Sequence, residues 1–77
     1  MTLLPLPAVL REHEAEVLEI TPVEIHGVPY ADVTLMYPDG VVASARLGRE
    51  SIPVGLAAGQ PVLVQSAMNV VVGVRRA

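Results

Sequence analysis

The chain has 77 residues, a net charge of −3 and no cysteine. Its length suffices for one small domain, and the lack of cysteine excludes stabilisation by a disulfide or a thiolate-bound metal. Its basic residues are five arginines and no lysine, which argues against general nucleic-acid binding, because phosphate contacts depend on such side chains. Small folds without covalent or metal cross-links often gain stability by association. We therefore expect self-association or a protein partner.

The hydrophobic residues predict strands. They make up 52% of the chain, yet only 3% of residues are aromatic, and both Phe and Trp are absent. The core must then be built from Val, Leu, Ile, Ala and Met, and β-branched side chains suit a pleated surface. The composition therefore favours an all-β fold with a thin core.

The first residues, MTLLPLPAVLREHE, predict an extended arm over residues 1–13, ahead of a single domain over 14–77. Pro5 and Pro7 restrict the residues before them to extended geometry. The arm can fold over its own domain, dock on a neighbouring subunit or stay disordered. The apolar run is too short for a membrane span and no basic region precedes it, so we expect a cytoplasmic protein.

Three strands are predicted in the first part of the domain. The apolar phase of residues 14–20 shifts at Leu18, which indicates a β-bulge, and residues 21–29 read as an irregular connection containing several helix and strand breakers. Residues 30–37 and 41–47 alternate with period two, which is typical of half-buried strands. Pro38-Asp39-Gly40 joins them as a hairpin turn. The predicted inner face consists of Ala31, Val33, Leu35, Tyr37, Val41, Ala43, Ala45 and Leu47.

Residues 48–59 break this alternation and predict one or two helical turns, with Ile52 and Leu56 as a plug. Residues 60–66 and 69–76 read as two more strands. We expect Val70, Val72 and Val74 to face the core, and Gly73 to lie on the outer face, where another backbone could approach closely. Five short strands with a plug favour a closed or nearly closed OB-like barrel, with an SH3-like roll as the alternative.

The second half, GLAAGQPVLVQSAMNVVVGV, resembles the transport-associated barrel of molybdate-binding proteins in its G-L-x-x-G-x-x-V turn and its final V-x-V-G-V strand. ADVTLMYPDGVVASARLGRESI is similar to the preceding hairpin and serine-containing segment of that family. The resemblance implies small barrels that associate and bind molybdate or tungstate between subunits. It also places Ser66 near the position of the lysine that the family carries before its last strand.

A weaker resemblance is to bacterial translation initiation factor one, through EVLEITP, the Asp-Gly hairpin with VVASARLG, and GLAAGQPVLV. It implies the same order of elements and a ribosome-associated or nucleic-acid-binding role. A third alternative is an accessory domain of a larger protein complex.

The candidate ligand-binding residues are Arg46, Arg49 and Ser51, together with Ser66. The first three, with backbone N–H groups of the helical turn, could hold a small oxyanion. The competing interpretation is that both arginines are solvated and that Ser51 caps the turn.

No catalytic or metal-binding motif is evident. His13 lies among three glutamates, which is not a defined metal site, and no nucleophile motif or phosphate loop is present. The sequence therefore predicts a non-enzymatic binding or assembly module without cofactor or metal, in which an oxyanion binds at a subunit interface.

Overall fold

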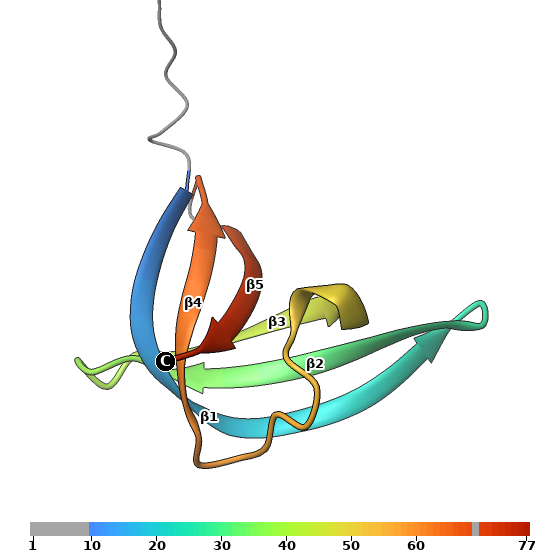
Figure 1. The fold of residues 1–77 in the computed structure, drawn as a ribbon, viewed down its shortest axis with the longest axis horizontal. Helices are drawn as coiled ribbons and strands as arrows, with labels where there is room; N and C mark the ends of the chain where they lie inside the picture. The colour runs from blue at the N-terminus through green and yellow to red at the C-terminus, as the bar shows by residue number, and fades with distance from the viewer. Residues whose placement is uncertain (1–9, 69) are drawn as a thin grey trace, which may run out of the picture.

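In the residues that the structure describes, the fold is a single antiparallel sheet of five strands. The computed structural model describes residues 10–68 and 70–77, and the sheet order is β3-β2-β1-β4-β5 (Figure 1). A 3₁₀ turn, η2, follows β3. The elements are β1 (Leu10–Ile25), β2 (Val28–Met36), β3 (Val42–Gly48), η2 (Arg49–Ser51), β4 (Pro61–Ala67) and β5 (Val70–Arg76). The small all-β fold predicted from composition is confirmed.

β1 is the long strand that both halves of the sheet share. Its first part, from Leu10 to Glu16, pairs with β4, and its second part, from Glu16 to Ile25, pairs with β2. The register shifts between Val17 and Glu19, where the sequence predicted a bulge, and the strand curves through this region (Figure 1). The bend lets the two halves of the sheet enclose one core.

The predicted connection over residues 21–29 is instead the end of a long hairpin. β1 continues to Ile25 and β2 begins at Val28, so only His26 and Gly27 form the turn. Both have positive φ, 51° and 79°, as a type I′ turn requires. The β1–β2 ladder accommodates both of the strand breakers predicted here. Pro22 lies opposite Ala31, and Pro29 lies opposite Glu24.

The second hairpin forms as predicted. The N–H of Gly40 donates to the Tyr37 carbonyl, the N–H of Val41 donates to Asp39 Oδ1, and Gly40 has φ +90°. The turn sets the β2–β3 register, in which Leu35 faces Ala43.

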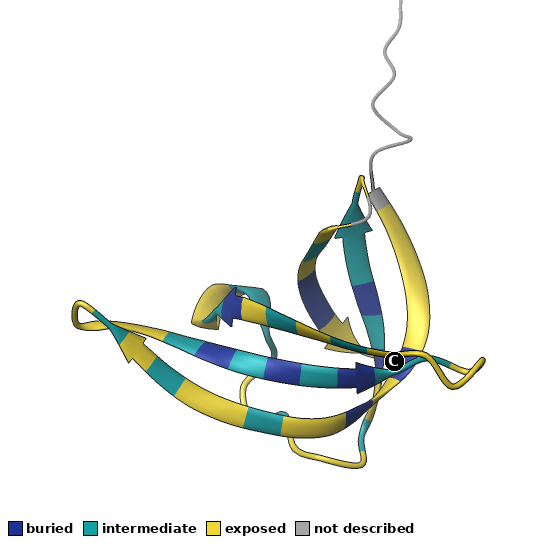
Figure 2. Ribbon diagram, turned by 180° about the vertical axis from the view of Figure 1, so that it is seen from behind, coloured by how far each residue is buried: buried dark blue, intermediate teal, exposed yellow. Residues whose placement is uncertain are grey.

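The core is small and lies on the inner side of the bend, with buried positions alternating along β2 (Figure 2). Leu35 is its largest fully buried side chain. Ile52 and Leu56 pack against it, as expected for residues that cover one end. The buried apolar residues are Ala15, Val17, Ala31, Val33, Leu35, Leu47, Val62, Val64 and Val74.

The predicted inner faces of the third and fifth strands are partly wrong. Val41 is 54% exposed because it lies in the hairpin turn, before β3 begins. In β5, Val74 is buried, but Val70 and Val72 are exposed. The register shifts between Gln65 and Ser66, so that Val72 has no partner in β4 and Val71 packs against the core instead. An extra residue in a strand reverses the faces of the residues before it.

Two further predictions need correction. The sheet is not a closed barrel in the described residues, because β3 pairs only with β2 and β5 only with β4. The predicted helical plug is a single 3₁₀ turn of three residues, since Pro53 and Gly55 follow within four residues of its end.

Gly73 is buried, not on an open outer face. A Cβ placed on it would lie 3.2 Å from the carbonyl oxygen of Ser51 and 3.2 Å from Gln65 Oε1. The expected close backbone approach therefore exists, but it is made by η2 of the same chain. Gly73 consequently gives no support to self-association.

Candidate functional site

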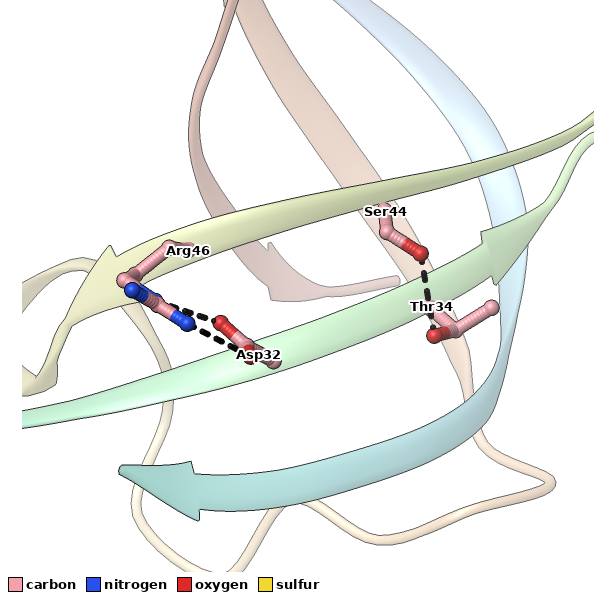
Figure 3. Close-up of polar contacts among 4 residues, drawn as sticks. All are labelled: Asp32, Thr34, Ser44 and Arg46. Atoms are coloured by element: carbon pink, nitrogen blue, oxygen red, sulfur yellow. Dashed lines mark hydrogen bonds and ion pairs between the residues drawn. The ribbon is translucent and has the colours of Figure 1, made fainter.

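Arg46 is held on the outer face of the β2–β3 hairpin. Its Nε and Nη2 donate to Asp32 Oδ1 and Oδ2 at 2.8 and 3.0 Å, and Thr34 and Ser44 form the next polar pair, 3.2 Å apart (Figure 3). The guanidinium lowers the pKa of Asp32, and the carboxylate raises the pKa of Arg46. A carboxylate therefore already occupies the bidentate face of Arg46 that an oxyanion would need.

Arg49 and Ser51 lie on η2. Arg49 is exposed and lines a groove described below, whereas Ser51 is half-buried beside Gly73. The residue at the N-terminal end of the turn is Gly48, which makes no side-chain capping bond, and Ser51 is the last residue of the turn. The interpretation of Ser51 as a cap is therefore wrong.

Ser66 is on β4 and lines a different pocket, of about 530 Å³. The ring of His13 packs edge-on against that of Tyr37 at this pocket, with centroids 6.4 Å apart. Thus Arg46, Arg49 and Ser66 do not line a common pocket. The remaining lining residues are Glu14, Pro38, Asp39, Val41 and Val71.

The two arginines at the end of β5 have partners within the chain. Arg75 donates to both carboxylate oxygens of Glu12, at 2.7 and 2.9 Å, and Gln65 donates to the same carboxylate at 3.2 Å. These bonds, that of Arg75 first, lower the pKa of Glu12 to about 2. Arg76 donates to the Val54 carbonyl at 2.6 Å and to Gln60 Oε1 at 3.2 Å.

An open groove of about 760 Å³, which we call the hairpin groove, lies at the far end of the β1–β2 hairpin. The distal part of the β1–β2 hairpin forms one wall, and η2 with the segment after it forms the other. Its charged lining residues are Glu24 and Arg49, and Val54 is 95% exposed. The other lining residues are Ile20, Pro22, Val23, Gly27, Pro29, Tyr30, Ala31, Ile52, Pro53, Gly55 and Leu56.

The sequence pattern predicts an irregular connection over residues 21–29 and therefore gives no indication of this groove. The sequence feature that could have indicated the groove is the set of prolines in its two walls, Pro22 and Pro29 on one side and Pro53 on the other. Only the paired register of β1 and β2 brings Pro22 and Pro29 to the same wall.

In the part of the chain that the structure describes, no three His, Asp or Glu side chains are grouped so as to hold a metal ion. Over the same residues no helix has the length and apolar character needed to cross a membrane.

No protein-family model matches the sequence, and neither a curated protein nor a solved structure matches it. The resemblances to the molybdate-binding barrel and to initiation factor one therefore stay predictions drawn from the motifs quoted above.

Proposed function

We propose that this chain is a non-enzymatic assembly module that joins two copies of itself through the free edge of β3. The observation that carries the proposal is that β3 is hydrogen-bonded only to β2 in the described residues. An unpaired strand edge presents a row of N–H and C=O groups that can pair with another strand.

The alternation of the hairpin identifies the backbone groups that are free. The N–H of Tyr37 donates to the Val41 carbonyl at 2.9 Å, which makes these two residues a hydrogen-bonded pair. In an antiparallel ladder every second residue bonds the same neighbour, so Val42, Ser44 and Arg46 direct their N–H and C=O groups away from β2. Near Gly48 the chain turns into η2. β5 lies near β3 but is not hydrogen-bonded to it, so the outward N–H and C=O groups of residues 42–46 have no strand partner in the described residues.

The other edge, β5, is protected in ways that β3 is not. It has a register shift at Val72, and it ends in Arg76; its other arginine, Arg75, is paired with Glu12 as Arg46 is with Asp32. Bulges and charged side chains are devices by which proteins block edge pairing. β3 has no proline and no register shift, and its one charged side chain, Arg46, is neutralised by Asp32.

The small core favours a second copy of the chain as the partner of the β3 edge. A domain of this size buries only about 60% of its unfolded surface, and here the largest fully buried side chain is a leucine, Leu35. Pairing of β3 with β3 of a second copy about a two-fold axis is self-complementary and closed. It extends one sheet through both copies and covers Val42, which is 54% exposed.

The strand order also supports a partly open OB-like architecture, in which β3 and β5 flank the unpaired seam. The expected oxyanion role is not part of the proposal, because Arg46 is bound by Asp32 and Arg49 and Ser66 line separate pockets.

The test is the mass in solution, measured by size-exclusion chromatography with light scattering over a range of micromolar concentrations. We expect a dimer for the unchanged chain. Ser44→Pro removes a free N–H without removing a bond to β2, and Val42→Lys adds a charge to the edge, so both are expected to give monomers.

The matched controls are Ser44→Ala, which removes the contact to Thr34 but keeps the N–H, and Val28→Lys, which adds the same charge at an exposed valine of β2. Both are expected to remain dimers. Circular dichroism checks that each variant is folded. A monomer for the unchanged chain, or a dimer that survives Val42→Lys, contradicts the proposal.

A further inference from the structure

We propose that the hairpin groove receives residues 3–7, Leu-Leu-Pro-Leu-Pro, from the N-terminal segment of a second copy. The proposal rests on the self-association proposed above and identifies a second contact within it. Residues 1–9 lie outside the described residues, so their sequence and the position at which β1 begins carry the inference.

The groove suits an uncharged, apolar occupant. Apart from Glu24 and Arg49 its lining side chains are uncharged, and most are aliphatic or proline. Val54 stands at its rim with 95% of its surface exposed, although aliphatic side chains are usually covered. Removing such surface from water contributes about 25 cal/mol per Å².

Residues 1–9, MTLLPLPAV, have the complementary composition, with no charged side chain and three leucines. Pro5 and Pro7 have no N–H, so two fewer backbone donors lose water when the segment is buried. A proline restricts the residue before it to extended geometry, so a sequence with prolines at 5 and 7 is expected to lose less conformational entropy on docking.

The lengths agree. The wall formed by β1 runs from Ile20 to Glu24, four residue steps of about 3.3 Å, or about 13 Å in all. An extended segment of four or five residues spans this length, and residues 3–7 contain all three leucines and both prolines of the N-terminal segment.

The starting point of β1 favours a second copy over the same chain. Leu10 pairs with Ala67, at the end of β1 opposite to the groove. Ten residue steps lead from Leu10 to Ile20, about 33 Å along the path of the bent strand, whereas residues 8 and 9, which link Leu10 to residue 7, reach about 10 Å when extended. Following β1, a chain's own segment is used up before it can lie in the groove.

The absence of cysteine allows a specific test. Leu4→Cys and Val54→Cys are made in separate full-length chains, which are then mixed and gently oxidised. We expect a disulfide-linked pair of the two chains, in several-fold greater yield than for Leu4→Cys mixed with Met68→Cys. Met68 is the control because it is 81% exposed and does not line the groove. Mass spectrometry identifies the linked peptides.

Three outcomes overturn the inference. A dimer by light scattering whose Leu4–Val54 yield equals that of the Met68 control overturns it and leaves the β3 proposal standing. A monomer by light scattering overturns both. A chain carrying both cysteines that closes an internal disulfide, at a rate independent of concentration, shows that the groove holds the chain's own segment.

Discussion

Arg75 and Glu12 form a bidentate ion pair across β4, the strand that separates theirs in the sheet. Gln65 of β4 donates to the same carboxylate, so three adjacent strands are joined on one face. The pair is solvent-exposed, and exposed ion pairs contribute little to stability. Its effect is therefore best detected through its dependence on pH.

We predict that the difference in unfolding free energy between the unchanged chain and Arg75→Gln shrinks as the pH falls from 4.5 to 2. Glu12 has its pKa lowered from 4.5 to about 2, so it stabilises the fold above pH 4.5 and loses this contribution through pH 2. Urea denaturation at a series of pH values measures the difference. Arg11→Gln is the control, and a difference independent of pH contradicts the prediction.

Leu35→Ala should destabilise the protein by about 2–5 kcal/mol, because Leu35 is fully buried and the neighbouring strands cannot close the cavity. This is a large part of the total for a domain of this size, at about 0.05–0.15 kcal/mol per residue. Val54→Ala, at a 95% exposed position, should change stability by less than about 0.5 kcal/mol. Thermal unfolding of the two variants compares them directly, and equal losses would show that the core is not where the structure places it.

Gly73→Ala should destabilise the fold by about 1–3 kcal/mol, as other overpacked sites do. The added Cβ would lie 3.2 Å from the Ser51 carbonyl, a backbone atom that moves only if η2 moves. Val72→Ala, at the preceding exposed position of β5, is the control and should have a small effect. Denaturant titration measures both, and a neutral Gly73→Ala would mean that η2 is free to shift.

His26→Asn should stabilise the long hairpin, because asparagine adopts positive φ more readily than histidine and Asn-Gly is the preferred type I′ pair. Gly27→Ala should cost about 1–2 kcal/mol, since its φ of 79° crowds a Cβ. The midpoints of thermal unfolding should fall in the order His26→Asn, unchanged chain, Gly27→Ala, from highest to lowest. Any other order contradicts the turn assignment.

Local patterns sufficed for the strands that alternate and for the turn between them. Ala31, Val33 and Leu35 are buried as predicted, because nothing interrupts the period of two between them. The same pattern gave the wrong prediction at Val72, because one extra residue in β5 reverses which side chains face the core. A run of valines looks the same with or without an extra residue. The pattern failed again at Pro22 and Pro29, since a proline is compatible with a strand when its ladder position requires no donor.

The polar contacts depend on the register of the strands. The local sequence pattern does not show which side chains that register brings together. The Pro38-Asp39-Gly40 turn places Arg46 opposite Asp32, and so removes Arg46 from the set of candidate ligand residues. The partnership of Glu12 with Arg75 joins residues 63 positions apart and requires the pairing of β1 with β4, which no local pattern encodes.

The division of β1 between two neighbours also predicts an order of events in folding. β1, β2 and β3 are joined by short turns, so their hairpins can form as soon as those residues are available. The first half of β1 must wait for β4, because their pairing closes a loop of about 50 residues, and long loops close slowly. Until that pairing forms, we expect residues 10–15 to have no strand partner and so to be exposed to mispairing with other chains.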